Sequence, residues 1–112
     1  MAGKFELSTS KDGQFMWNLK AGNGQIILTS ERYKAKASAL NGVESVRKNS
    51  QDDARFDRRE SKKGEPYFVL TATNGEIIGR SEMYSSNSAM ENGIDSVRRH
   101  AVEAKLVEET EA

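Results

Sequence analysis

The chain has 112 residues, and its 17 Lys and Arg residues balance its 17 Asp and Glu residues, so the formal net charge at pH 7 is zero. This balance argues against a global field that would draw the protein to nucleic acid or anionic lipid. Cysteine is absent, which excludes a disulfide framework, thiol catalysis and a cysteine-based metal site. No apolar run approaches the ~20 residues that span a bilayer, so we expect a soluble, cytoplasmic protein with no membrane partner.

The sequence contains an internal repeat. Residues 5–49 realign on residues 56–100 with a constant offset of fifty-one and no gap. Turn residues, apolar positions and helix ends recur, whereas almost no reactive side chain does. A chain of this length buries roughly two-thirds of its unfolded surface, while half that length is only marginally stable alone. We therefore predict one domain over residues 1–112, with repeats at about 4–50 and 55–108, and a monomer, because the tandem repeat takes the place of a dimer.

Three strands open the first repeat. Residues 4–10 form the first, and a turn at Lys11-Asp12-Gly13 separates it from an alternating segment at residues 15–21. Asn23-Gly24, which tolerates the positive φ angles of a tight hairpin turn, leads into the third strand. The second repeat has the same pattern, with strands at residues 55–61, from Pro66 to Ala72 and from Ile77-Ile78, and with Asn74-Gly75 between the last two.

A helix follows the strands in each repeat, since the apolar spacing becomes four and then three after Tyr33 and after Tyr84. Serines suit the start of the second helix, and basic pairs are expected in the last turn of each helix. The apolar positions are Ala39, Val43 and Val46, matched by Met90, Ile94 and Val97; the serines are Ser85, Ser86 and Ser88; the basic pairs are Arg47-Lys48 and Arg98-Arg99.

Glycine recurs inside both helices, at Gly42 and Gly93. Glycine costs a helix interior about 1 kcal/mol relative to alanine, so we expect a close approach of helix to sheet as the compensation. Residues 49–55 form the polar connection between the repeats. The chain is predicted to end in a strand at 103–108 and a frayed acidic end.

Strand alternation assigns the two faces of the sheet. Both helices are predicted to cover one face and to bury Trp17, Phe68, Leu19, Leu70, Val43, Ile94, Val46 and Val97. The opposite face is predicted to be uncovered and to carry Met16, Asn18, Lys20, Tyr67, Val69 and Thr71. An uncovered sheet face is a natural docking surface.

The tandem Asn-Gly hairpins, the Ser-Glu-x-Tyr segments and the helices carrying Asn-Gly-[Val/Ile]-x-Ser-Val-Arg resemble the YegP-like family of small bacterial proteins, a domain of unknown function. The resemblance implies an α+β fold in which two tandem β(3)-α(-β) repeats with pseudo-twofold symmetry merge into one antiparallel sheet, with exchanged terminal strands and two helices on one face. The strand near 55–61 would close the first half and open the second. The family implies no catalytic residue. Gly79 opposite Leu28 departs from the repeat, and we expect it to weaken packing there.

The sequence has few groups of side chains that could act in catalysis or bind a metal ion. His100 is the only histidine, and we interpret it as a solvated residue near a helix C-terminus rather than a general base. The pairs Asp52-Asp53 and Glu108-Glu109 lack the spaced oxygen ligands of a calcium or magnesium site. Gly22-x-Gly24 lacks the spacing of a phosphate loop. We therefore predict no catalytic residue, no metal and no cofactor.

The polar motif that repeats is Ser-Glu-x-Tyr, at Ser30-Glu31-x-Tyr33 and Ser81-Glu82-x-Tyr84. One interpretation is a pair of equivalent binding sites related by the pseudo-twofold. The favoured one is a corner between strand and helix, in which the tyrosine anchors the helix and its hydroxyl finds one partner.

A basic cluster is the sharpest candidate binding surface. It comprises Arg55, Arg58, Arg59, Lys62 and Lys63 beside Tyr67, with Lys20 on the same sheet face. Such a surface can stack bases and hold phosphates, but carboxylates interrupt it and the pI is near 6.6. The leading hypothesis is therefore a non-enzymatic interaction module whose partner, a protein, binds the uncovered face or an exposed edge strand. The alternative is weak binding of single-stranded nucleic acid through the cluster at 55–63.

Overall fold

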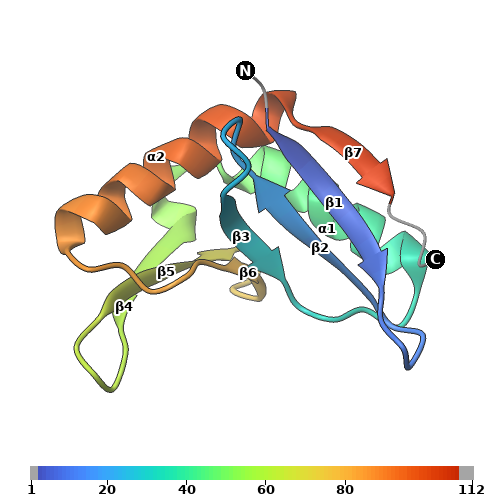
Figure 1. Cartoon of the computed structure of the whole chain (residues 1–112), viewed down its shortest axis with the longest axis horizontal. Helices are drawn as coiled ribbons and strands as arrows, with labels where there is room; N and C mark the ends of the chain where they lie inside the picture. Colours follow the sequence, from blue (N-terminus) through green and yellow to red (C-terminus); the bar gives the residue numbers. More distant parts are fainter. Residues whose placement is uncertain (1–2, 109–112) are drawn as a thin grey trace.

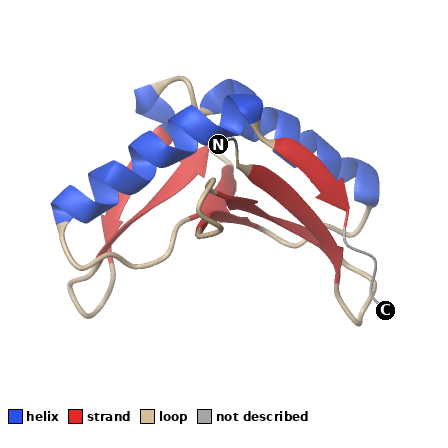
Figure 2. Ribbon diagram, turned by 45° about the horizontal axis from the view of Figure 1, so that its top comes forward, coloured by secondary structure: helices blue, strands red, loops and turns tan. Residues whose placement is uncertain are grey.

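The computed structural model describes residues 3–108 and confirms an α+β fold (Figure 1). Its seven strands form one sheet in the order β4-β5-β6-β3-β2-β1-β7. Both helices lie on one face of this sheet, which arches beneath them (Figure 2). In chain order the elements are β1 (Lys4–Thr9), β2 (Phe15–Lys20), β3 (Ile26–Ser30), α1 (Lys36–Asn49), the 3₁₀ turn η1 (Asp53–Arg55), β4 (Phe56–Glu60), β5 (Pro66–Thr71), β6 (Ile77–Arg80), α2 (Asn87–Glu103) and β7 (Lys105–Glu108).

The four hairpin turns share one geometry, in which only glycine adopts positive φ. In the β2–β3 turn the Gly24 N–H donates to the Ala21 carbonyl, the Ala21 N–H donates to the Gln25 carbonyl, and Gly24 has φ of 87°. This is a type I turn followed by a left-handed glycine, so the adjacent asparagine keeps negative φ. Gly13, Gly64 and Gly75 repeat the conformation.

The sheet is mixed rather than wholly antiparallel, which corrects one part of the prediction. β7 follows α2 at the end of the second repeat and pairs in parallel with β1 of the first repeat, from Lys4 opposite Lys105 to Leu7 opposite Glu108. The other adjacent pairs are antiparallel. A parallel pair needs a crossover connection, and α2 carries the chain over to the edge beside β1 before β7 begins. β4 follows α1 and opens the second repeat by pairing with β5, as expected, but it lies at the edge of the sheet and pairs with no strand of the first repeat, so it does not close the first half.

The repeats meet at the short β3–β6 ladder, where Thr29 pairs with Arg80 and Ser30 with Gly79. The offset of fifty-one maps the Thr29–Arg80 pair onto itself, so the pseudo-twofold axis passes through it. Gly79 does not weaken packing there. A Cβ at Gly79 would lie 2.8 Å from Leu28 Cγ, and Leu28 is fully buried. The leucine of one repeat therefore occupies the space that a side chain in the other repeat would need.

The predicted core is confirmed. The eight side chains assigned to the helix-covered face are each at most 2% exposed. Phe5 and Trp17 meet edge to face with ring centroids 5.5 Å apart, and Phe56 and Phe68 repeat that contact at 5.6 Å. Within residues 3–108, no helix is both long and apolar enough to cross a membrane.

The helix ends agree only in part with the sequence prediction. Ser86 is the N-cap of α2, and its Oγ accepts a hydrogen bond of 3.1 Å from the Ala89 N–H. The equivalent residue of α1, Ala35, has no side chain that can do this. α2 continues to Glu103, so Arg98 and Arg99 precede its last turn, which contains His100 instead. The strand that follows begins at Lys105 rather than at residue 103, and the predicted frayed end at 109–112 lies outside the described residues.

The serine of each Ser-Glu-x-Tyr motif builds a backbone corner. Ser30 Oγ accepts a 2.9 Å hydrogen bond from the Trp17 N–H and donates one of 2.7 Å to the Glu31 carbonyl. Ser81 repeats both contacts, with the Phe68 N–H at 2.9 Å and the Glu82 carbonyl at 2.8 Å. Both serines are buried, so their hydroxyl groups are committed to the fold.

The tyrosine of each motif makes the closest approach to the helical glycine, and the predicted approach of helix to sheet is confirmed only at Gly42, where Trp17 of β2 lies 3.1 Å from a Cβ position. A Cβ at Gly42 would lie 2.5 Å from the Tyr33 hydroxyl, and a Cβ at Gly93 would overlap the Tyr84 hydroxyl. The Tyr84 ring also stacks on Phe68, with centroids 6.2 Å apart. Neither tyrosine hydroxyl has a hydrogen-bond partner among residues 3–108, contrary to the expectation of one. The two motifs that recur in the sequence are thus the two sides of one packing contact.

Replacing Gly93 by leucine should destabilise the protein by about 3 kcal/mol, because the new side chain has to displace the stacked Tyr84 ring. The same substitution at the exposed neighbour Asn92 should change the free energy of unfolding by no more than about 0.5 kcal/mol. Urea unfolding of both variants measures the difference. Equal stability of the two variants would show that Tyr84 does not restrict position 93.

Replacing Ala35 by serine should stabilise the protein by about 0.5–1 kcal/mol, because it gives α1 the N-cap that Ser86 supplies to α2. The reciprocal change, Ser86→Ala, should cost about the same amount. Both are read from the shift in the urea midpoint at constant slope. A midpoint unchanged in both variants would contradict the capping account.

Candidate functional site

The sheet face turned away from the helices, the open face, is concave (Figure 2). Alternation and register assign to it Lys4, Glu6 and Ser8 of β1, Met16, Asn18 and Lys20 of β2, Thr29 of β3, Arg80 of β6, Tyr67, Val69 and Thr71 of β5, Asp57 and Arg59 of β4, and Lys105 and Val107 of β7. All six residues predicted for this face are present. Val69, however, is fully buried, because it lies between the longer side chains of Asp57 and Arg80 on a concave surface.

An ion-pair cluster lies on β1 and β2 of the open face. Glu6 is only 8% exposed and accepts from Lys20 Nζ at 2.8 Å and Lys4 Nζ at 2.9 Å. Hydrogen bonds from Lys20 and then from Lys4 lower the pKa of the Glu6 carboxyl below its ordinary value. Lys20 is therefore committed to Glu6.

Arg80 lies at the centre of the open face, on the pseudo-twofold axis. It is exposed, and its guanidinium makes no ion pair or hydrogen bond with any of residues 3–108. It lines a hollow of about 260 Å³ together with Thr29, Ser30, Glu31 and Ser81. The strand positions of the face hold five cations and two carboxylates, and Glu31 at the hollow adds a third carboxylate, so the local charge is +2 (5 − 3).

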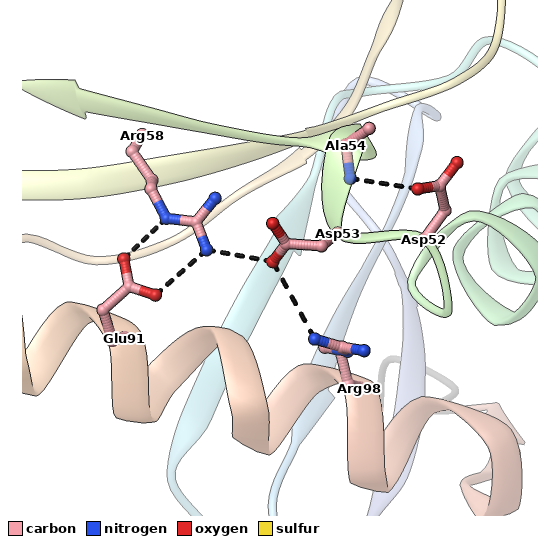
Figure 3. Close-up of polar contacts among 6 residues, drawn as sticks. All are labelled: Asp52, Asp53, Ala54, Arg58, Glu91 and Arg98. Carbon is pink, nitrogen blue, oxygen red and sulfur yellow. Dashed lines mark hydrogen bonds and ion pairs between the residues drawn. The ribbon is translucent and has the colours of Figure 1, made fainter.

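The predicted basic cluster is divided between the two sides of β4. Arg58 points to the helix side, where its Nε lies 2.5 Å and its Nη2 3.0 Å from the two carboxylate oxygens of Glu91 (Figure 3). Its Nη2 also donates to Asp53 at 3.0 Å, and Asp53 lies 3.8 Å from Arg98. The hydrogen bonds raise the pKa of Arg58, and the guanidinium lowers the pKa of Glu91. This network ties the connection between the repeats to α2.

The other cations of the cluster are dispersed. Arg59 lies on the open face, where it pairs with Asp57 at 2.8 Å and lies opposite Tyr67 of β5. Arg55 pairs with Asp52 at 3.4 Å. Lys62 and Lys63 are exposed in the β4–β5 turn. Lys20 is on β2, three strands from Tyr67 and thus roughly 14 Å away. The structure brings Arg59 and Tyr67 together but does not gather the seven residues into one patch.

Two pseudo-equivalent clefts lie between the repeats on either side of the axis. The Tyr33 cleft, of about 460 Å³, has one wall from the motif and helix of the first repeat and the other from the β5–β6 hairpin. The Tyr84 cleft, of about 640 Å³, has one wall from the second motif and α2 and the other from the β2–β3 hairpin. Residues at equivalent positions line both clefts: Glu31 and Glu82, Tyr33 and Tyr84, Glu76 and Gln25, Ile77 and Ile26.

The clefts differ at one of these lining positions and at one position behind the wall. Glu76 gives the Tyr33 cleft a second carboxylate where the Tyr84 cleft has Gln25. Trp17, next to Gly42 of the Tyr33 cleft, corresponds to Phe68 in the other repeat. In both clefts burial raises the tyrosine pKa, and the negative charge of the motif glutamate raises it further.

His100 is half-buried and hydrogen-bonded rather than solvated. Its Nε2 accepts from the Gly22 N–H at 3.3 Å, and its Nδ1 lies 2.8 Å from the Ser96 carbonyl. These contacts fit a neutral imidazole protonated on Nδ1, which links the end of α2 to the β2–β3 turn. Gly22 and Gly24 belong to that turn.

The acidic pairs also have structural partners. Asp52 accepts from the Ala54 N–H and caps η1, and Asp53 bridges Arg58 and Arg98 (Figure 3). Glu108 pairs with Lys36 of α1, while Glu109 lies outside the described residues. Within residues 3–108 no three His, Asp or Glu side chains are grouped so that they could hold a metal ion.

Sequence reasoning missed Arg80 and Glu76. Both are positions where the second repeat departs from the first, since Arg80 aligns with Thr29 and Glu76 with Gln25. A polar residue that differs between otherwise matching repeats was the available signal. Placing Arg80 on the axis and Glu76 in a cleft requires knowledge of the strand order.

Comparison with known proteins agrees with the repeat and the fold. The profile of the family described as "Domain of unknown function (DUF1508)" matches residues 10–57 and 61–108, two copies with the same offset of fifty-one. A UPF0339 protein of Bordetella pertussis is 55% identical over 112 residues, covering 100% of both chains. A UPF0339 protein of Pseudomonas aeruginosa is 54% identical over 110 residues, or 98% of this chain and 100% of the relative.

Two solution NMR structures have the same fold. The protein of unknown function yegP from E. coli has a TM-score of 0.94 at 46% identity, covering 100% of this chain and 97% of that one. A UPF0339 protein from Shewanella oneidensis has a TM-score of 0.92 at 48% identity, covering 98% and 93%. With two copies of the family domain and relatives of this identity along its length, the chain belongs to the YegP-like DUF1508 family, whose function is unknown.

Proposed function

We propose that the protein is a non-enzymatic binding module that docks an acidic segment of a partner protein on the open face of its sheet. The observation that carries the proposal is Arg80, an exposed and unpaired cation at the centre of a concave face with a local charge of +2. A carboxylate of the partner would find there a guanidinium without a competing partner.

The repeated scaffold supports a binding role rather than catalysis. The residues that recur form turns, the core and the tyrosine–glycine contact, and the single histidine is engaged at both ring nitrogens. A face of mixed polarity, with Met16 and Tyr67 among hydroxyl and amide groups, suits a protein partner.

The open face is favoured over edge pairing. The edge strand β4 reads Phe-Asp-Arg-Arg-Glu, and its last four residues are exposed and charged. Charged edge strands discourage the addition of another strand. The opposite edge, β7, is short.

Single-stranded nucleic acid is the second candidate and is less well supported. Arg55, Arg58 and Arg59 each pair with a carboxylate, so phosphates would have to compete with those pairs. Lys62 and Lys63 of the β4–β5 turn, which have no ion-pair partner in the described part of the chain, are the main feature in its favour.

We also propose that the chain acts as a monomer in the cytoplasm. The exchanged strand β7 already pairs the second repeat with the first inside one chain. Multi-angle light scattering tests the oligomeric state, and a mass near twice 12.4 kDa would contradict it.

Titration of the protein with a labelled oligoglutamate peptide at low salt tests the proposal, with labelled oligothymidylate as the competing probe. The peptide should shift amide resonances of β3, β6 and β2, and Arg80→Glu should weaken its binding about tenfold. Arg99→Glu makes the same charge change on the outer side of α2 and is the control. No peptide binding, or an equal loss in both variants, would refute the docking site. Oligothymidylate binding that is lost on reversal of Lys62 and Lys63 would favour the second candidate.

A further inference from the structure

We propose that the Tyr33 cleft is a binding site for an aliphatic diamine or polyamine, and that the Tyr84 cleft is not. The two clefts are lined by equivalent positions of the two repeats but differ in charge. This site is separate from the open face, although Glu31 lies at the junction of the Tyr33 cleft with the central hollow.

The charge of the Tyr33 cleft matches a ligand with two ammonium groups. Glu31 belongs to one wall and Glu76, from the β5–β6 hairpin, to the other. Neither carboxylate has an ion-pair partner among residues 3–108, and no Lys or Arg lines the cleft. A ligand lying across the cleft would place one ammonium near each wall. In the Tyr84 cleft the second carboxylate is replaced by Gln25, so one charge would stay unmatched.

The remaining lining suits the body of such a ligand. Ile77 and Ile78 provide an apolar surface for a methylene chain, and the amides of Asn41 and Asn74 can bind further polar groups. Tyr33 presents an aromatic ring beside a carboxylate, and the pKa of its hydroxyl is raised by burial and further by the charge of Glu31. An ammonium gains from both the carboxylate and the ring.

An unsatisfied donor lies behind the cleft wall. The Trp17 indole N–H is fully buried and has no hydrogen-bond partner within residues 3–108. A Cβ atom built at Gly42 would lie 3.1 Å from the Trp17 Nε1 and 2.5 Å from the Tyr33 hydroxyl. The Trp17 Nε1 and the Tyr33 hydroxyl therefore lie at most about 5.6 Å apart. Buried donors are seldom left unpaired in native proteins, and because an ammonium group is itself only a donor, the acceptor has to come from the protein. A small turn of Tyr33 toward Trp17 on ligand binding would provide the acceptor.

Trp17 is the only tryptophan, so its indole N–H resonance reports on this cleft alone. Spermidine titrated at low salt should shift that resonance saturably and bind about fivefold more tightly than butylamine, which has a single amine. Glu76→Gln, which copies Gln25 of the other cleft, should abolish the preference for spermidine. Glu65→Gln removes the same charge from the β4–β5 turn, outside the cleft, and should leave the preference unchanged.

The pseudo-symmetry also allows a gain of binding. Gln25→Glu gives the Tyr84 cleft its second carboxylate, so the variant should bind a second spermidine, detected as new amide shifts around Tyr84. Three results would overturn the proposal: no saturable shift of the Trp17 resonance, an equal effect of Glu65→Gln and Glu76→Gln, or a preference for spermidine that survives Glu76→Gln. Glu76→Gln should lose a site and Gln25→Glu should gain one, so a folding defect in either variant does not by itself decide the outcome.

Discussion

The contact of Leu28 with Gly79 across the β3–β6 ladder is the constraint on which the joined fold depends. These two residues occupy equivalent positions next to the pseudo-twofold axis, where their side chains would compete for the same volume. A tandem chain can place leucine in one repeat and glycine in the other, so one side chain fills the space for both. A homodimer of identical repeats has no such freedom, because any residue on the axis meets its own copy. The same reasoning explains Arg80, which faces Thr29 on the open side of the axis instead of a second arginine.

Further contacts hold the two repeats in one core. β7 adds to β1, Arg47 of α1 donates to the Ala104 carbonyl at 2.7 Å, and the guanidinium of Arg47 lies 5.5 Å from the centre of the Phe5 ring. Each cleft likewise has one wall from each repeat. The open face and both clefts are therefore formed jointly by the two repeats, so a substitution in one repeat changes a surface that both repeats share.

Much of the fold could be predicted from the sequence because turn glycines and apolar periodicity act locally. The hairpins at Gly24 and Gly75 and the buried face of Trp17 and Phe68 follow from such signals. The parallel pairing of β7 does not follow from local signals, because an exchanged strand is fixed by contacts between residues far apart in the chain. The role of Gly93 was predicted with the wrong partner, because the sequence shows that something approaches the helix but not that the Tyr84 ring does.

The candidate site was less predictable for a physical reason. Adjacent strand residues point to opposite faces, so the run Arg58-Arg59 is divided by the sheet, and nearby carboxylates pair with both arginines. Arg80, by contrast, has no basic neighbour in the sequence, and its importance arises from strand order alone.

A double-mutant cycle at the axis tests the joined core most directly. Leu28→Ala should cost about 3 kcal/mol through the cavity it leaves, and Gly79→Ala about 2 kcal/mol through overlap with Leu28. In the Leu28→Ala background the second change should cost at least about 1 kcal/mol less, because the new methyl group enters the vacated space. Additive costs within about 0.3 kcal/mol would show that the two residues do not share one volume, and would contradict the account of how the repeats are joined.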